Sequence, residues 1–327
     1  MTAHGTTRLV RVNDLRVYFG ARERPARAVD GLSFEVHAGE TVALVGESGG
    51  GKSVAALALA RLNPEPPAWY AGGQILFRGR DVLTMGEGDL RRLRGRGMAY
   101  VFQEPAQALN PVLTIGRQIR EALDLHDPSP SSPGQVRRLL EKVDMADPDR
   151  VAASYPHQLS GGMQQRAVIA MALACRPELL IADEPTTALD VTLQAQILKR
   201  LAALRDEFGM AILLITHNFG LVAELAERAY VMYAGTLVES GPVEAVLEHP
   251  AHPYTRCLLA AVPRLDGRRV GHTPPLRGQV PSPVEWPAGC RFHPRCPLAQ
   301  PVCAEQAPNM EPVGPGHEAA CPFWRAS

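Results

Sequence analysis

The sequence contains few lysines and no long apolar segment. Three of its 34 basic residues are lysines, and acidic and basic side chains balance to a formal net charge of zero. A neutral chain has no excess positive charge to attract a polyanion, so we expect no nucleic-acid partner. No apolar run approaches the roughly 18 residues of a membrane-spanning helix, and the N-terminus lacks the apolar core of a signal peptide. These absences predict a cytoplasmic chain that meets a membrane only through a partner.

Short cysteine knuckles are also missing. Four of the six cysteines lie in the last 38 residues, at Cys290, Cys296, Cys303 and Cys321. Disulfides are rare in the cytoplasm, so this clustering indicates a metal site. Zinc sites usually contain two cysteines separated by two to four residues, whereas wider spacing suits an iron–sulfur cluster held by four thiolates. We expect the iron–sulfur cluster, with Zn²⁺ as the alternative.

A glycine-rich loop stands near the N-terminus between two predicted elements. Thr41–Val45 has the pattern of a buried strand, and an apolar helix is predicted from Val54 to Ala60. The segment between them matches G-x-x-x-x-G-K-S and consists of Gly46, Glu47, Ser48, Gly49, Gly50, Gly51, Lys52 and Ser53. Such a loop curls backbone N–H groups around phosphate oxygens. We expect Lys52 to reach the β- and γ-phosphates of a nucleotide and the Ser53 hydroxyl to bind Mg²⁺.

Two carboxylates end a second apolar strand, Leu179–Asp183. If this strand lies beside the strand before the loop, Asp183 reaches the Mg²⁺ and binds it through water, as a hard oxygen ligand. Glu184 is one residue further on, points in a different direction, and is expected to polarise the attacking water as general base. These two positions therefore predict hydrolysis of the bound nucleotide.

A second predicted anion-binding helix N-terminus follows Leu159. Ser160 precedes a long helix and is expected to form its N-cap, while Gly161 and Gly162 expose backbone N–H groups. An ordinary structural N-cap is the alternative interpretation of this pattern alone.

The order of the predicted elements indicates an α/β fold. Strand and helix patterns alternate from about residue 162 to 226, which implies a parallel sheet with crossover helices. A mostly helical insertion is predicted at about residues 104–165. Proline, histidine and cysteine become more frequent beyond Gly241, where we expect little regular structure. We predict one domain over residues 8–245 and a C-terminal extension over residues 246–327.

Taken in order, these motifs resemble the ATP-binding subunits of ABC transporters over about residues 8–245. The matching segments are Gly46–Ser53, Gln103, Leu159–Gln164, Leu179–Glu184, Ala188–Asp190 and His217. Four stretches are similar to the dipeptide/oligopeptide importer ATPases, and to the D-type of their two paired subunits: Tyr155–Gln158, Met163–Arg166, Asp183–Val191 and His252–Thr255. The implied fold is a P-loop NTPase core with a RecA-like parallel sheet, an N-terminal antiparallel β subdomain and a helical insertion, followed by a small Cys/Pro-rich extension.

The resemblance implies roles for further residues around ATP. Phe19 would stack on adenine, with Tyr18 on the other strand face as the alternative. Gln103 would contact Mg²⁺ and the attacking water. His217 would hold the γ-phosphate and orient Glu184. The implied catalytic set is therefore Glu184, His217, Gln103 and Lys52, and Val54 completes the nucleotide-binding loop.

The resemblance also implies that two subunits share each ATP. Ser160, Gly161 and Gly162 would contact the γ-phosphate of ATP held by the opposing subunit, and Asp190 would lie at that interface. Two positions depart from the family pattern: Gly50 replaces the frequent serine or cysteine, and Asn218 replaces the usual aspartate after the histidine. The first adds backbone freedom, and the second changes hydrogen bonding near the interface.

The implied activity is ATP hydrolysis that powers import of di- and oligopeptides at the cytoplasmic face of the cell membrane. The implied cofactors are ATP, Mg²⁺ and a [4Fe–4S] cluster, which some members hold with the four C-terminal cysteines. The implied partners are an F-type ATPase subunit, two transmembrane permeases and, indirectly, an extracytoplasmic solute-binding protein. Import of nickel or another small solute and a soluble ABC ATPase acting on DNA or ribosomes are the alternatives. A redox-sensing cluster is the alternative to a structural one.

Overall fold

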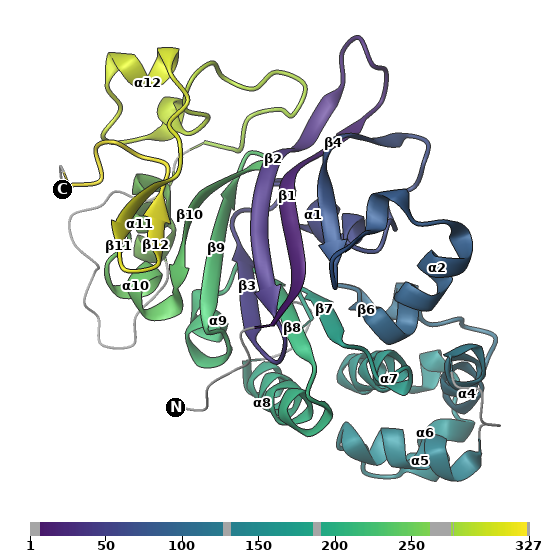
Figure 1. Ribbon diagram of the computed structural model, residues 1–327. Coiled ribbons are helices and arrows are strands. Elements are labelled where there is room, and N and C mark those ends of the chain that lie inside the picture. Colours follow the sequence, from purple (N-terminus) through teal and green to yellow (C-terminus); the bar gives the residue numbers. More distant parts are fainter. Residues whose placement is uncertain (1–6, 127–131, 186–190, 262–275, 277, 326–327) are drawn as a thin grey trace. The chain divides into compact units, whose positions relative to one another are not determined.

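The computed structural model describes residues 7–126, 132–185, 191–261, 276 and 278–325 (Figure 1). Its residues form two compact units. Among the described residues, unit 1 comprises Thr7, His37–Thr41 and Thr84–Leu214. Unit 2 comprises Arg8–Val36, Val42–Leu83 and the part of Ile215–Ser327 that is described. The predicted phosphate-binding loop and the C-terminal extension therefore belong to the same unit.

Unit 2 begins with the predicted antiparallel sheet. Its strands are β1 (Arg8–Phe19), β2 (Ala26–His37), β4 (Ala68–Phe77) and β5 (Arg80–Asp81), in the order β2-β1-β4-β5. β1 pairs antiparallel with β4, and the register shifts after Asn13, close to Asp14 with its φ of 46°. Leu15 and Val17 are fully buried on one face of β1, as the alternation in the sequence predicts.

A second group of strands in unit 2 positions the phosphate-binding loop. β3 (Thr41–Val45) pairs parallel with β9 (Arg228–Tyr233), and β9 forms an antiparallel hairpin with β10 (Thr236–Pro242). Helices α1 (Lys52–Ala58) and α9 (Phe219–Leu225) belong to the same unit. The β3 strand is buried along its whole length, so the loop that follows it starts from a fixed point.

The expectation of little regular structure beyond Gly241 is wrong. This region contains α10 (Val243–Glu248), α11 (Pro253–Ala260), α12 (Pro301–Glu305), β11 (Glu311–Gly314) and β12 (His317–Ala319). β12 pairs antiparallel with β10 and β11 pairs with β12, so the extension adds two strands to the edge of the hairpin (Figure 1). Both strands are too short to show an alternating apolar pattern, and Pro312, Gly314 and Gly316 are typical of loops.

Unit 1 contains the other predicted parallel strands. β6 (Met98–Val101) pairs parallel with β7 (Leu179–Asp183), and β8 (Ala211–Thr216) lies on the other side of β7. All residues of β7 and β8 are buried, which is typical of parallel strands covered on both faces. Helices α7 (Gly161–Ala174) and α8 (Val191–Phe208) connect these strands. The alternation of strand and helix confirms the α/β fold class.

The predicted helical insertion is also present in unit 1. It consists of α3 (Pro105–Ala108), α4 (Ile115–His126), α5 (Pro133–Lys142) and α6 (Pro148–Ala153), and α2 (Glu87–Arg92) precedes it. α4 and α5 contact α7 through an apolar stripe that includes Ile119, Leu123 and Leu140. Residues 127–131 of this insertion lie outside the described residues. Within the described chain, no helix is long and apolar enough to cross a membrane.

Candidate nucleotide-binding and catalytic residues

Two positions of the phosphate-binding loop require glycine. Gly46 and Gly51 have φ angles of 150° and 96°. A Cβ atom at Gly46 would lie 2.2 Å from the backbone oxygen of Met232, and one at Gly51 would lie 2.2 Å from the backbone oxygen of Ala28. Side chains are excluded at both positions because the obstructing atoms belong to the backbone. The loop is therefore shaped by its neighbouring strands as well as by its own sequence.

The cationic side chain of the loop folds back onto the loop. Lys52 is 5% exposed, and its Nζ atom donates hydrogen bonds to the backbone oxygens of Gly46 (2.8 Å) and Glu47 (2.9 Å). Ser53, the predicted Mg²⁺ ligand, is exposed in the first turn of α1. The ammonium group is thus held at the mouth of a loop whose shape suits an anion.

Glu47 is held by two residues that the sequence did not single out for the loop. The backbone N–H of Glu47 donates to the Tyr254 Oη atom at 2.8 Å. Its carboxylate accepts two hydrogen bonds from Arg295, at 2.7 and 3.0 Å. Tyr254 lies in the His252–Thr255 stretch that resembles the peptide importers, but Arg295 is separated from the loop by 248 residues and no local pattern marks it.

The aromatic residues predicted to contact adenine lie at the end of β1. Tyr18 and Phe19 are both half-buried. The Tyr18 hydroxyl donates to Asp30 Oδ1 at 2.6 Å, and its ring contacts Trp69 edge-on with centroids 5.2 Å apart. Burial and the Asp30 carboxylate raise the pKa of Tyr18, which keeps this hydroxyl a donor. These contacts engage the alternative residue, Tyr18, in structural packing, and Phe19 stays the prediction for adenine stacking.

In unit 1, Asp183 has one satisfied and one unsatisfied carboxylate oxygen. Tyr100 donates its hydroxyl to Asp183 Oδ2 at 2.6 Å. Burial and the nearby Asp183 charge raise the pKa of Tyr100 well above its usual range, so the hydroxyl keeps its proton. The Oδ1 atom is buried and has no hydrogen-bond partner among the described residues. A buried anionic oxygen without a partner is costly, and it is the type of ligand that Mg²⁺ takes.

Glu184 follows directly and is contacted by Gln103. The Gln103 Nε2 atom donates to Glu184 Oε2 at 3.0 Å, so the structure brings two of the predicted catalytic residues together. Glu184 is 9% exposed and has a φ of 45°, which is unusual for a residue other than glycine. Strained backbone of this kind is concentrated at functional sites.

The predicted signature segment begins α7. Ser160 is its N-cap, and the Ser160 Oγ atom accepts a hydrogen bond from the backbone N–H of Met163 at 3.4 Å, so the predicted capping is confirmed. Ser160 and Gly161 are exposed and Gly162 is buried. The Gln164 side chain donates to the backbone oxygen of Pro156 at 2.9 Å and fixes the turn before the helix. The N-terminus of α7 therefore presents its first residues to solvent.

The remaining predicted site residues follow β8 or lie outside the described chain. His217 is exposed after β8 and belongs to unit 2, whereas Glu184 belongs to unit 1. Asn218 caps α9, and its Oδ1 atom accepts from the backbone N–H of Gly220 at 2.9 Å. Asparagine caps helices as well as aspartate does, which explains how this position tolerates the departure from the family pattern. Asp190 lies outside the described residues.

The four C-terminal cysteines line one cavity of about 240 Å³ in unit 2. The backbone N–H of Cys290 donates to the backbone oxygen of Cys303 at 2.8 Å, which ties the two segments together. Burial raises the pKa of the Cys290 and Cys321 thiols, and raises the pKa of Cys296 to about 11. In the part of the chain that is described, no group of three or more His, Cys, Asp or Glu side chains is arranged to hold a metal ion. The predicted clustering is present, without the geometry of a metal site.

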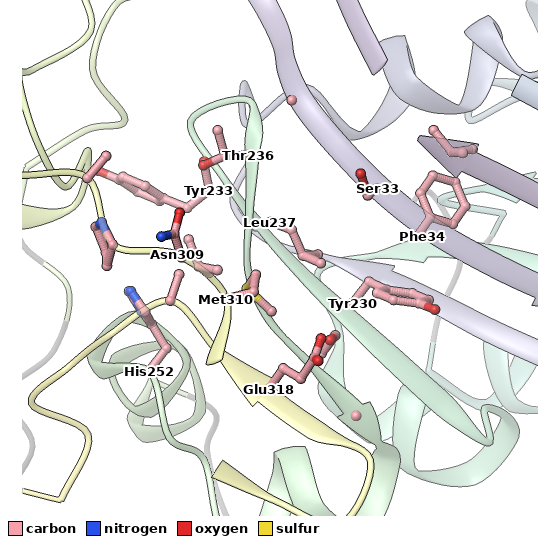
Figure 2. Close-up of a pocket in the computed structure, with 18 of the residues that line it drawn as sticks. Ser33, Phe34, Tyr230, Tyr233, Thr236, Leu237, His252, Asn309, Met310 and Glu318 are labelled. Atoms are coloured by element: carbon pink, nitrogen blue, oxygen red, sulfur yellow. The ribbon is translucent and has the colours of Figure 1, made fainter. Parts of the chain in front are cut away.

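A larger cavity of about 1120 Å³ adjoins this one in unit 2 and shares His252, Cys290 and Phe292 with it. Figure 2 shows that its walls come from Ser33 and Phe34 of β2, from the β9–β10 hairpin, and from the C-terminal residues Asn309, Met310 and Glu318. No residue of the phosphate-binding loop, residues 46–53, lines it. This cavity is therefore distinct from the nucleotide-binding loop.

A phosphate-binding loop after a buried parallel strand, together with the Gln103–Glu184 contact and the capped signature helix, defines an ATPase of the ABC class. Comparison with known proteins agrees. A family model described as "ABC transporter" matches residues 29–187, and one described as "Oligopeptide/dipeptide transporter, C-terminal region" matches residues 238–303. A relative from Sinorhizobium fredii, named a probable peptide ABC transporter ATP-binding protein, is 48% identical and covers 98% of this chain and 95% of its own. The chain belongs to the ATP-binding subunits of ABC transporters.

Further relatives and solved structures support this assignment. A Brucella abortus protein, named provisionally a peptide import ATP-binding protein, is 47% identical, with 97% of this chain and 95% of that protein covered. A dimeric ATP-binding cassette in a post-hydrolysis state, bound to ADP and Pi, is 26% identical with a TM-score of 0.65, covering 72% of this chain and 99% of its own. A Clostridium perfringens component of the cbiONQ complex, 23% identical with a TM-score of 0.62, covers 74% of this chain and 92% of its own and shares the fold. The predicted ABC-type core is confirmed.

Proposed function

We propose that this subunit hydrolyses Mg²⁺–ATP to power import of di- and oligopeptides. The hydrolytic part of the proposal rests on the hydrogen bond from Gln103 to Glu184. The preceding residue, Asp183, has one buried carboxylate oxygen that no described residue contacts by a hydrogen bond and that a ligand can therefore use. Unit 2 contributes phosphate binding through Gly46–Ser53 and Val54, with Phe19 for adenine and His217 for the γ-phosphate. Unit 1 contributes Glu184 as general base and Gln103 as the residue that would contact Mg²⁺ and the attacking water.

The residues present suit Mg²⁺ as the metal of this reaction. Asp183 Oδ1 is a buried, unpartnered anionic oxygen, which is a hard ligand for a hard cation. Ser53 supplies an exposed hydroxyl and Gln103 an exposed amide oxygen. Mg²⁺ would neutralise charge on the phosphates, and Asp183, Ser53 and Gln103 would hold it in place.

The direct test of the hydrolytic role is the substitution Glu184→Gln. In the assembled transporter we expect ATP to remain bound while turnover falls by about 100-fold or more, because general-base assistance is lost. ATP-dependent association of the two ATPase subunits should persist, because the variant does not hydrolyse the ATP that holds the subunits together. The matched control is Glu104→Gln, which neutralises an exposed carboxylate next to Gln103. Turnover of Glu184→Gln close to that of the control would contradict the proposal.

Two ATPase subunits are proposed to share each nucleotide. Ser160 and Gly161 are exposed at the start of α7, where the helix can receive an anion from another chain. Gly162 and Asp190 belong to the same proposed interface by their place in the motifs. The similar cassette bound to ADP and Pi is described as dimeric, which supports this arrangement. The proposed partner is an F-type subunit, so the pair is a heterodimer.

Unit 1 exposes three large apolar side chains that are proposed to contact the permease subunits. Phe102, Val112 and Leu125 are 43%, 75% and 70% exposed, which is high for large apolar side chains. Leu125 also lines a cavity of about 1030 Å³ between α4, α5 and α6. Two permeases bound here would place the subunit at the cytoplasmic face of the membrane, with an extracytoplasmic solute-binding protein as an indirect partner.

Peptides are the proposed solute because the extension matches the oligopeptide/dipeptide transporter family over residues 238–303. The S. fredii and B. abortus relatives, whose names refer to peptide transport or import, support this choice over nickel or another small solute. Uptake of labelled di- and tripeptides by cells with and without this subunit tests it, and loss of nickel uptake alone would contradict it.

The four C-terminal cysteines are proposed to hold a [4Fe–4S] cluster, with Zn²⁺ as the alternative. Support comes from the donor set, because Cys290, Cys296, Cys303 and Cys321 all line one cavity of about 240 Å³. A bound cluster would supply cross-links between segments of the extension. Protein purified without oxygen should contain about four iron atoms per chain. Recovery of zinc instead, or of neither metal, would contradict this assignment.

A further inference from the structure

The C-terminal extension holds Glu47 of the phosphate-binding loop through two residues, Tyr254 and Arg295. Tyr254 of α11 accepts a hydrogen bond from the Glu47 backbone N–H at 2.8 Å. Arg295, between Cys290 and Cys296, donates to both carboxylate oxygens of Glu47 at 2.7 and 3.0 Å. Both the main chain and the side chain of Glu47 are therefore fixed by residues of the extension.

Arg295 is itself held rigidly. Its side chain is 6% exposed, lies over the Tyr233 ring with its guanidinium carbon 5.7 Å from the centroid, and donates to the Tyr233 hydroxyl at 3.3 Å. Burial alone would lower the pKa of Arg295, but the hydrogen bonds with Glu47 and Tyr233 outweigh it and raise the pKa. The two parallel hydrogen bonds from the guanidinium group orient the Glu47 carboxylate as well as pairing with its charge. A lysine ammonium group cannot form this bidentate arrangement.

Tyr254 and Tyr233 belong to one aromatic cluster. Their ring centroids are 4.6 Å apart, and Phe292 contacts both rings at 5.3 and 5.2 Å. Tyr254 is fully buried and Phe292 is 1% exposed. Because Phe292 lies between Cys290 and Arg295 in the chain, the segment that carries Arg295 packs on the residue that holds the loop backbone.

The contact has an electrostatic consequence for a loop that binds a polyphosphate. Glu47 places a carboxylate in that loop, where negative charge opposes an anionic ligand. Arg295 pairs with this carboxylate at both oxygens, which offsets the repulsion between the Glu47 carboxylate and the phosphates. Gly46 before Glu47 and the three glycines after Ser48 give the loop backbone freedom, so an anchored Glu47 also limits that freedom.

We propose that Arg295 is a positioning residue for the phosphate-binding loop: it neutralises and orients Glu47, so that nucleotide affinity depends on the C-terminal extension. Arg295 acts through Glu47. This inference rests on the proposed ATP-binding function.

The test is a set of ATP affinities measured by calorimetry on the full-length chain with Mg²⁺ and ATP. For Arg295→Met we expect the Kd for ATP to rise about tenfold, which corresponds to about 1.4 kcal/mol. Arg295→Lys should give a value between those of the wild type and Arg295→Met. The double variant Glu47→Gln with Arg295→Met should bind more tightly than Arg295→Met alone, since the carboxylate to be neutralised is gone. The control is Arg24→Met, which removes the exposed ion pair of Arg24 with Glu285 of the extension.

The outcomes separate positioning from general support of the fold. An unchanged Kd in a folded Arg295→Met or Arg295→Lys variant overturns the proposal. Equal weakening in the single and double variants, accompanied by equal loss of melting temperature, also overturns it and assigns Arg295 a purely structural role. If Arg295→Met does not fold, Arg295→Lys decides the question. Failure of the wild-type chain to bind ATP would instead refute the proposed function.

Discussion

The two halves of the nucleotide machinery are organised differently. In unit 2, the charged residues of the phosphate-binding loop are paired: Lys52 donates to two backbone oxygens, and Glu47 pairs with Arg295. In unit 1, Asp183 keeps one buried carboxylate oxygen that no described residue contacts by a hydrogen bond. In the loop half, both charged side chains therefore have hydrogen-bond partners within the protein. In the carboxylate half, one oxygen of Asp183 has none among the described residues and is available to bind a cation.

The two halves also differ in how far along the chain their supports lie. The residues that hold Glu47 follow it by 207 and 248 positions. In the carboxylate half, Tyr100 and Gln103 both come from the end of β6, which pairs directly with β7. The carboxylate half is thus organised by adjacent strands. The loop half depends on the C-terminal extension, which follows the ATPase core in the sequence.

The largest expected effect comes from neutralising the unsatisfied anion with Asp183→Asn. Mg²⁺-dependent hydrolysis should fall by about 100-fold or more, because the metal loses a charged ligand. Without nucleotide, the same variant should melt at a higher temperature than the wild type, since it removes the charge of a buried carboxylate whose Oδ1 atom has no hydrogen-bond partner among the described residues. Thermal denaturation with and without Mg²⁺–ATP, and steady-state hydrolysis, measure both effects.

The matched control for Asp183→Asn is Tyr100→Phe. It removes the hydrogen bond to Asp183 Oδ2 and leaves the charge in place, so stability should fall by about 1 kcal/mol. The two variants therefore shift the melting temperature in opposite directions. A lower melting temperature for Asp183→Asn would show that its carboxylate is satisfied, and would remove the contrast between the two halves.

Local sequence patterns predicted the parts of the site that local structure determines. The strands Thr41–Val45 and Leu179–Asp183 have the predicted bounds, because uninterrupted apolar runs next to glycine or charge leave little choice of register. The Ser160 cap follows from a serine placed before a long helix. The fold class followed from the same alternation of strands and helices.

Long-range contacts could not be predicted in the same way. Arg295 is one of many arginines, and its contact with Glu47 depends on the path of a proline-rich segment that has no periodic pattern. Strands β11 and β12 have four and three residues, so neither shows alternation. The cysteine spacing indicated the shared cavity of the four thiols, but spacing alone does not fix the distances between sulfur atoms.

A smaller effect is expected from acid, and it concerns the N-cap of α11, the helix that contributes Tyr254 to the loop half. His252 caps α11, and its Nδ1 atom accepts from the backbone N–H of Tyr254 at 3.0 Å. Burial lowers the pKa of His252 to about 4, so the folded chain keeps this ring neutral. The unfolded chain binds a proton near pH 6.5, and stability should therefore fall as pH drops from about 6.5 to about 4, by about 3 kcal/mol in total.

The comparison variant for this effect is His252→Asn, which keeps an acceptor at the N-cap and cannot be protonated. Urea unfolding of both chains between about pH 7.5 and about pH 4.5, which spans the titration of this histidine in the unfolded chain, gives the difference in free energy of unfolding. This difference should favour the variant increasingly as pH falls, because other titrating groups are common to both chains. ATP affinity of the two folded chains should run parallel across this window, because the folded wild type keeps His252 neutral above its pKa of about 4. Parallel stability curves for the two chains would mean that His252 is not the group whose protonation in the unfolded chain lowers the stability.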